Sequence, residues 1–210
     1  MKVIVVGSNG QLGQCIKDQI KQMNVTDEYI LYSKSELDIT KFNDVERIIE
    51  DVIPNIVINA SGFTNVDEAE NHFTDANNIN NLSVKNLAEL CKRINATLIH
   101  ISTDYVFDGD ANIPYKEDDK KLPISKYGKT KLSGENSIIS SGCFFIIIRT
   151  SWVFSEYGKN FMKSMLNLFL NKEIINVVND QIGCPTYAQD IAKVILRLIE
   201  HIKEGKLFQE

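Results

Sequence analysis

Several features are missing from this 210-residue sequence, and each absence excludes a class of protein. No run of eighteen apolar residues exists, so we expect no membrane-spanning helix. The opening residues, MKVIVVGSNG, are too short and too rich in glycine for a signal peptide, so we expect a cytoplasmic protein. Cysteine is scarce, and no C-x-x-C spacing occurs among Cys15, Cys91, Cys143 and Cys184. Because the three histidines also lie far apart, we expect reduced thiols, no disulfide framework and no metal site.

Basic residues are too few for a general binder of nucleic acids or anionic membranes. The chain has 23 Lys and Arg against 28 Asp and Glu, which gives a net charge of −5 and a pI near 5.3. Low-complexity tracts are absent and 43% of the residues are hydrophobic, so disorder is not expected. The length allows one domain, or one and a partial second, with a sizeable core.

Short apolar segments alternate with segments of helical periodicity. Five segments are apolar throughout, as strands covered on both faces of a sheet are, and they span residues 2–6, 29–32, 55–59, 97–101 and 143–148. Apolar residues at helical spacing predict helices over residues 11–23, 44–52 and about 74–94. This alternation predicts an α/β fold with a Rossmann-like, doubly wound parallel sheet. An α/β domain without a nucleotide site is the alternative.

A glycine-rich turn, GSNGQLG, lies between the first predicted strand and the first predicted helix. Gly7, Gly10 and Gly13 permit a tight turn, and the helix N-terminus offers free N–H groups to a pyrophosphate. The position of the motif between a strand and a helix strengthens this interpretation over a purely structural turn. We therefore predict a bound dinucleotide.

The end of the second predicted strand carries no acidic residue for the ribose hydroxyls of NAD. Ser33 and Lys34 stand there instead, and no carboxylate comes before Glu36 and Asp38. A hydroxyl and an ammonium suit a 2′-phosphate, so we predict that NADPH is used at least as well as NADH. The alternative is that Lys34 is an ordinary solvated charge.

Three residues after the fourth predicted strand form a candidate catalytic set. Thr103 follows that strand, and Tyr127 and Lys131 are four residues apart, which places them on one face of a helix. A phenol with a pKa of about 10 needs help to exchange protons at neutral pH, and a neighbouring ammonium lowers its pKa. We predict that Tyr127 delivers a proton to a substrate carbonyl that Thr103 hydrogen-bonds, while the cofactor delivers hydride.

Five segments together resemble the dTDP-4-dehydrorhamnose reductase family of extended short-chain dehydrogenases/reductases, namely NASGFTNVDEAE (59–70), STDYVFDG (102–109), YGKTKLSGE (127–135), RTSWVF (149–154) and NDQIGCPT (179–186). The resemblance covers essentially the whole chain. It implies reduction of the 4-keto group of dTDP-6-deoxy-L-lyxo-4-hexulose to dTDP-L-rhamnose, for rhamnose-containing polysaccharide. The catalytic residues implied are Thr103, Tyr127 and Lys131, and the substrate-binding residues are Thr103, Asp104 and Trp152. With the motifs above, the expected cofactor-binding residues are Gly7, Gly10, Gln11, Leu12, Gly13, Ser33, Lys34, Asp38, Ile39, Ala60, Ser61, Gly62, Tyr127 and Lys131.

We expect a dinucleotide-binding Rossmann domain over residues 1–150 and a mixed region over 151–210 that contributes to the substrate site. Family chains usually run further, so we expect this substrate region to be incomplete, a further strand to begin within 206–210, and sugar turnover to be weak. Arg149 has two interpretations, as a partner of a diphosphate or as part of a structural ion pair. A homodimer is compatible with the family.

Two other functions stay open. One is a non-catalytic regulatory subunit similar to the β subunit of methionine adenosyltransferase, which shares the segments STDYVFDG and YGKTK. The other is a nucleotide-sugar epimerase or 4,6-dehydratase, although a dehydratase is expected to carry an acidic pair after Thr103, where this chain has Asp104 and Tyr105.

Overall fold

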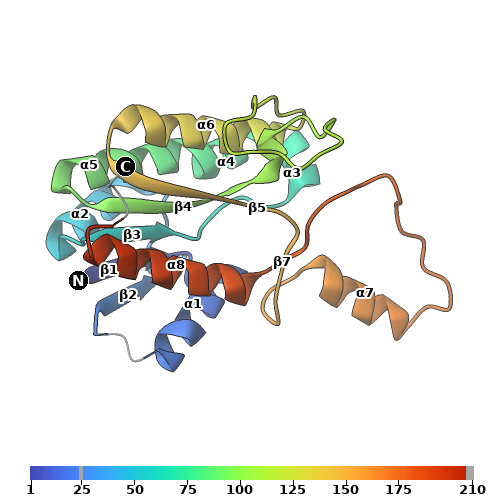
Figure 1. The fold of residues 1–210 in the computed structure, drawn as a ribbon, viewed down its shortest axis with the longest axis horizontal. Coiled ribbons are helices and arrows are strands. Elements are labelled where there is room, and N and C mark those ends of the chain that lie inside the picture. The colour runs from blue at the N-terminus through green and yellow to red at the C-terminus, as the bar shows by residue number, and fades with distance from the viewer. Residues whose placement is uncertain (24–25, 207–210) are drawn as a thin grey trace.

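The computed structural model describes residues 1–23 and 26–206, and its centre is a parallel sheet of five strands (Figure 1). The strands are β1 (Lys2–Val6), β2 (Glu28–Tyr32), β3 (Ile56–Asn59), β4 (Thr97–Thr103) and β5 (Phe144–Thr150). Their order is β2-β1-β3-β4-β5, and every neighbouring pair is parallel. The five predicted strands and the Rossmann-like α/β fold are confirmed. The order reverses between β1 and β3, where such sheets open a ligand crevice at their carboxyl ends.

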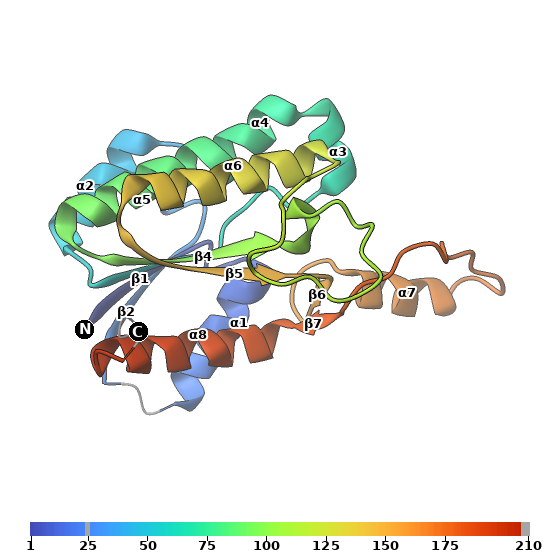
Figure 2. The same ribbon diagram turned by 45° about the horizontal axis from the view of Figure 1, so that its top comes forward.

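Helices cover both faces of the sheet (Figures 1 and 2). On one face lie α2 (Phe42–Val52), α5 (Ser83–Ile94) and α6 (Lys126–Ser141); on the other lie α1 (Gln11–Gln22) and α8 (Ala188–Lys203). Successive side chains of a strand point to opposite faces, so Ile4 packs with the first group of helices and Val3 with the second. This double burial explains why the strands are largely apolar on both faces instead of alternating with polar residues.

The helix predicted over about 74–94 is broken into three parts. It consists of α4 (Phe73–Asn77), a π-helical turn (Asn78–Leu82) and α5. The buried Asn80 lies in the π turn, and its side chain exchanges hydrogen bonds with the backbone N–H and C=O of Phe63 and donates to Thr130 Oγ1. The spacing of apolar residues does not reveal this π turn, because the turn depends on the polar contacts of Asn80.

Several elements were not predicted. They are α3 (Val66–Asn71), α7 (Phe161–Phe169), α8 and the parallel pair β6 (Val153–Phe154) with β7 (Thr186–Tyr187). Helix α7 and the segment after it project away from the sheet (Figures 1 and 2), and they expose many large apolar side chains, among them Phe161, Leu166, Phe169, Leu170, Ile174 and Ile182. The strand expected within 206–210 falls mainly on residues 207–210, which lie outside the described residues.

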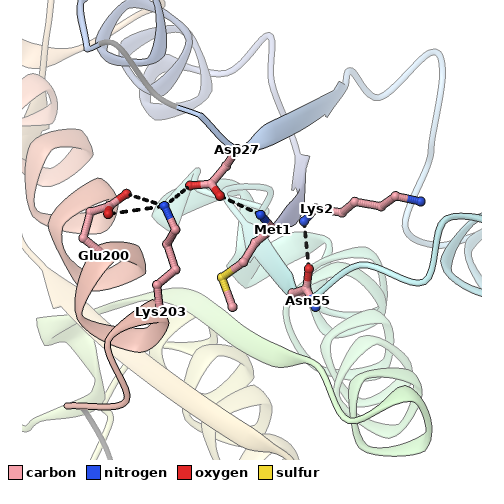
Figure 3. Close-up of polar contacts among 6 residues, drawn as sticks. All are labelled: Met1, Lys2, Asp27, Asn55, Glu200 and Lys203. Carbon is pink, nitrogen blue, oxygen red and sulfur yellow. Dashed lines mark hydrogen bonds and ion pairs between the residues drawn. The ribbon is translucent and has the colours of Figure 1, made fainter.

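A buried carboxylate ties the start of the chain to α8 (Figure 3). The Asp27 side chain is only 2% exposed and accepts from the Met1 ammonium at 2.6 Å and from Lys203 Nζ at 2.7 Å. Burial opposes ionisation, but these two cations outweigh it and lower the pKa of Asp27. Lys203 also bonds Glu200 on its own helix.

Candidate active site

A cavity of about 750 Å³ opens at the carboxyl ends of β1, β3 and β4. Fifteen of the predicted site residues line it, and they are Gly7, Gly10, Gln11, Leu12, Lys34, Asp38, Ile39, Ala60, Ser61, Gly62, Thr103, Asp104, Tyr127, Lys131 and Trp152. Gly13 and Ser33 are the two that do not. The volume is within the usual range for cofactor and ligand sites.

The glycine turn forms a close-fitting cradle at the start of α1. Gly7 has a φ of +81°, and a Cβ there would lie 2.8 Å from the amide nitrogen of Ser61. No side chain caps α1 at Gly10, and no acidic residue stands in its first turn. These features leave N–H groups and the positive end of the helix dipole for an anion. A pyrophosphate therefore fits the residues present.

Gly13 shapes this turn from outside the cavity. A Cβ on Gly13 would lie 2.6 Å from the Cα of Ser8, so any larger residue would push the helix away from the turn. Gly13 is predicted to bind the cofactor. In this structure it lies outside the cavity lining, and its lack of a side chain lets α1 pack against the turn. Gln11 lines the cavity and also reaches across it, since its Nε2 donates to Val153 O at 3.0 Å.

Ser33 differs from its predicted role. It is 4% exposed and lies outside the cavity lining, and both its N–H and its hydroxyl donate to Glu36 Oε2, at 2.8 and 2.6 Å. These bonds lower the pKa of Glu36. Since Ser33 is already engaged, Lys34 is the residue of this pair that the structure brings to the cavity. No motif indicates that the Glu36 side chain folds back onto the end of β2.

The structure brings Thr103, Tyr127 and Lys131 to one wall of the cavity. Thr103 is the last residue of β4, and its Oγ1 accepts from the N–H of Tyr105 at 3.2 Å. Helix α6 starts at a Ser125 cap, whose Oγ accepts from the N–H of Gly128 at 3.0 Å. A Cβ on Gly128 would collide with the carbonyl oxygen of Tyr105, so this glycine allows α6 to approach the end of β4.

Burial dominates the proton chemistry of this wall. It raises the pKa of Tyr127 to about 12, and the hydroxyl of Thr103 opposes the rise. In this structure the Thr103 hydroxyl, and not Lys131 as predicted, is the group that lowers this pKa. Lys131 Nζ donates to the carbonyl oxygen of Ile101 at 2.6 Å. Burial also lowers the pKa of Lys131 to about 8, with Glu135 opposing.

Residues after β5 complete the cavity with Trp152, Val153, Gly158, Lys159 and Ile191. Trp152 has a φ of +46°, an unusual value for a residue other than glycine, and its indole lies against Gly183. A Cβ on Gly183 would be 2.7 Å from the ring. The segments RTSWVF and NDQIGCPT are therefore adjacent in space, which their separation in sequence does not reveal.

Arg149 forms the structural ion pair rather than a cavity wall. It lies outside the lining, and its Nη2 and Nε donate to the two carboxylate oxygens of Glu135 at 2.8 and 3.0 Å. Glu135 is 1% exposed and also accepts from the hydroxyl of Ser102 at 2.5 Å. Of the two interpretations of Arg149, the ion pair is confirmed. Sequence analysis missed Glu135, Ser102 and the buried His100, because nothing in their spacing marks them.

The described residues offer neither a metal cluster nor a membrane-spanning helix. Within residues 1–23 and 26–206, no group of three or more His, Cys, Asp or Glu side chains could hold a metal ion. Over the same residues, no helix is long and apolar enough to cross a membrane.

Comparison with known proteins gives one consistent result. The family model for the RmlD substrate binding domain matches residues 1–209. A dTDP-4-dehydrorhamnose reductase of Aggregatibacter actinomycetemcomitans is 43% identical over 98% of this chain and 69% of its own length. The corresponding reductase of Sinorhizobium fredii is 39% identical over 94% of this chain and 66% of its own length. This chain thus spans about two thirds of the length of these relatives.

Solved structures agree with these relatives. A dTDP-4-dehydrorhamnose reductase from Clostridium acetobutylicum superposes with a TM-score of 0.91 at 41% identity, over 96% of this chain and 71% of that one. The reductase from Bacillus anthracis, solved in complex with NADP, has a TM-score of 0.90 at 37% identity, over 95% of this chain and 70% of that one. A UDP-glucose 4-epimerase from Brucella ovis shares the fold with a TM-score of 0.79 but is only 18% identical.

Proposed function

The chain belongs to the dTDP-4-dehydrorhamnose reductase family, and from that premise we propose that it reduces the 4-keto group of dTDP-6-deoxy-L-lyxo-4-hexulose to dTDP-L-rhamnose with NADPH or NADH. One observation supports this proposal most directly. Thr103, Tyr127 and Lys131 line the same cavity as the glycine cradle of α1. We expect a dinucleotide whose pyrophosphate lies in the cradle to present its nicotinamide to the three side chains.

Different residues of the cavity bind the cofactor and the sugar nucleotide. Gly7, Gly10 and the start of α1 hold the pyrophosphate, and Lys34 faces the ribose that carries a 2′-phosphate in NADPH. When bound, the reduced nicotinamide supplies a hydride. Asp104 and Trp152 hold the sugar nucleotide. Both line the cavity, which supports a contribution of the region from residue 151 onward to the substrate site.

Tyr127 donates a proton to the carbonyl oxygen as that oxygen gains negative charge, and Thr103 hydrogen-bonds the same oxygen. A protonated phenol is the form that this step requires, and the raised pKa of Tyr127 keeps it protonated at neutral pH. The raised value therefore suits an enzyme that works in the direction of reduction. Lys131 stands next to Tyr127 along α6 and lines the cavity on the same side.

The test is the loss of NAD(P)H absorbance with the dTDP-4-keto sugar, with the product identified by NMR as dTDP-L-rhamnose. Tyr127→Phe should lower kcat by about a hundredfold to ten-thousandfold with little change in cofactor affinity. Tyr115→Phe is the matched control, because the Tyr115 hydroxyl binds Asp108 and lies outside the cavity lining. Full turnover in Tyr127→Phe would overturn the assignment of the acid. Cofactor binding without any turnover would favour a regulatory subunit, and product without net NAD(P)H oxidation would favour an epimerase or dehydratase.

Several expectations stay predictions alongside this function. Lys34→Ala should raise KM for NADPH more than for NADH, since only NADPH carries the 2′-phosphate. A homodimer is tested by light scattering, and a cytoplasmic location is tested by cell fractionation.

A further inference from the structure

Trp152, the one tryptophan of the sequence, has an uncommon backbone conformation beside the cavity. Its φ is +46°, a value that residues with a side chain rarely adopt, because the Cβ crowds the backbone. Such a conformation persists only where neighbouring groups hold it. Since Trp152 is also 43% exposed, the burial of its own side chain is not enough to hold it. The contacts that hold Trp152 therefore indicate what its position serves.

A segment distant in sequence, residues 183–186, holds the backbone around Trp152. The N–H of Thr186 donates to the carbonyl oxygen of Trp152 at 3.3 Å. The hydroxyl of Ser151 donates to the carbonyl oxygen of Cys184 at 3.1 Å and accepts from the N–H of Cys184 at 3.4 Å. Strands β6 and β7 continue this contact, with Val153 paired with Thr186. The segment thus fixes the backbone on both sides of the indole.

Gly183, the first residue of this segment, stacks on the indole itself. A Cβ on Gly183 would lie 2.7 Å from Cε2, 2.9 Å from Cζ2 and 3.1 Å from Cδ2 of Trp152. Cε2 is bonded to three atoms in the plane of the indole, so nothing can come this close to it from the edge of the ring. The Cβ position is therefore above the face of the indole, roughly 1 Å short of an ordinary contact between carbon atoms. A glycine leaves this face free to lie against the segment.

The backbone of Gly183 does not itself require a glycine. Its φ is not positive, so an alanine could adopt the same conformation. The three atoms nearest to the added carbon would all belong to the Trp152 ring. The indole is therefore the reason that a side chain does not fit at this position.

The segment supports the indole from outside the cavity, because Trp152 lines the cavity and Gly183 does not. Aromatic side chains are common in ligand sites. A side chain that is already held in place loses less freedom when a ligand binds, and this increases affinity. A supported indole suits a binding surface better than a ring that is free to turn.

We propose that Gly183 is a positioning residue that acts through Trp152, by supporting one face of the indole so that the ring is held in place for the sugar nucleotide. The part of this proposal that concerns the ligand rests on the proposed reductase function, in which Trp152 binds the sugar nucleotide. The support of the indole by Gly183 does not depend on that function.

The first test needs no ligand. Because the sequence contains one tryptophan, fluorescence excited where tyrosine does not absorb reports the Trp152 ring alone. In Gly183→Ala the ring and the segment must separate, so acrylamide should quench the fluorescence more strongly and the anisotropy should fall. Ile182→Ala is the matched control, because Ile182 is the neighbouring residue and its side chain is fully exposed, and it should behave as the wild type does. Unchanged quenching and anisotropy in Gly183→Ala would overturn the proposal.

The second test measures the binding of dTDP-L-rhamnose and of NADPH by calorimetry. Gly183→Ala should raise the Kd for dTDP-L-rhamnose about tenfold and leave the Kd for NADPH within about twofold. The double variant Gly183→Ala with Trp152→Ala should bind dTDP-L-rhamnose no more weakly than Trp152→Ala alone, since the added carbon then meets no ring. Additive losses, or an equal loss of NADPH affinity, would show that Gly183 acts on the fold in general and would contradict the proposal.

Steady-state kinetics test the same role in the reaction. If the wild-type chain turns over the dTDP-4-keto sugar, Gly183→Ala should raise KM for the sugar while kcat and KM for NADPH change little. An unchanged KM for the sugar would refute the role in binding. A wild-type chain that shows the expected fluorescence differences but neither binds dTDP-L-rhamnose nor reduces the keto sugar would count against the proposed function alone, and the support of the indole by Gly183 would stand.

Discussion

In the variant Arg149→Met, the guanidinium that pairs with Glu135 is removed while most of the carbon chain is kept. Glu135 is 1% exposed and receives two N–H groups from Arg149 and the hydroxyl of Ser102. The variant removes two of these three donors from a buried carboxylate. The change therefore tests whether Arg149 holds the fold or binds a ligand.

The expected loss of stability follows from the partners left behind. Breaking a buried ion pair by removing one member typically costs about 3–5 kcal/mol, because an uncompensated charge stays in the interior. The side chain of Arg149 is 21% exposed, so water can replace part of its contribution, and Ser102 still donates. We therefore expect a loss near the lower limit, about 3 kcal/mol. That is a large share of the 5–15 kcal/mol by which domains are usually stable.

Urea unfolding followed by circular dichroism, with linear extrapolation to water, measures this loss. The double variant Arg149→Met with Glu135→Gln removes both charges, and it should regain much of the stability, since a neutral amide can still accept from Ser102. Arg197→Met is the control, because Arg197 is exposed on α8 and its loss should change stability by no more than about 0.5 kcal/mol.

Two results would refute this account. A loss below about 1 kcal/mol in Arg149→Met would show that the ion pair contributes little. Normal stability combined with weaker binding of a sugar nucleotide would instead support the diphosphate interpretation of Arg149.

Three further predictions concern the cradle, the helix packing and acid stability. Gly7→Ala should weaken NADPH binding at least tenfold by calorimetry, because the added carbon would lie 2.8 Å from the Ser61 nitrogen; unchanged affinity would contradict the cradle. Gly134→Ala should lower the free energy of unfolding by about 1–3 kcal/mol, because its Cβ would collide with the carbonyl oxygen of Asn80; an unchanged urea midpoint would show that α6 can shift. The folded-state pKa of Asp27 is lowered, so its ion pairs stabilise the fold above about pH 4 and lose that effect as pH falls through the folded value. Asp27→Asn should therefore be less stable at pH 7 and should lose less stability between pH 7 and about pH 2; equal acid slopes for both proteins would count against this.

The sheet was predictable because its strands leave two independent signals in the sequence. Each is a short, largely apolar run, and each is followed by a helix or a turn, so β1, β3 and β4 could be predicted without any structure. Two elements were not predicted, for different reasons. Helix α8 has a clear apolar face but lies in the region 151–210, for which the sequence analysis predicts only mixed structure. The π turn at Asn78–Leu82 depends on hydrogen bonds, which the spacing of apolar residues does not indicate.

Site residues could be predicted from the sequence where a residue type at that position has few other uses. Glycine at position 7 and the Tyr127–Lys131 spacing leave few alternatives, and both lie on the cavity. Ser33 and Arg149 were harder, because a hydroxyl or a guanidinium can bind either a ligand or a neighbour. In both cases the side chain binds a neighbouring glutamate whose position the sequence does not indicate. Ser33 binds Glu36, and Arg149 binds Glu135.

The placement of α8 beside α1 has a consequence for biosynthesis. The face of the sheet that α1 leaves uncovered is closed by Ile191, Ile195 and Ile199. A ribosome adding about 5–20 residues per second reaches these positions on the order of ten to thirty seconds after it has made α1. During that interval the apolar face of the sheet beside α1 has no cover from α8.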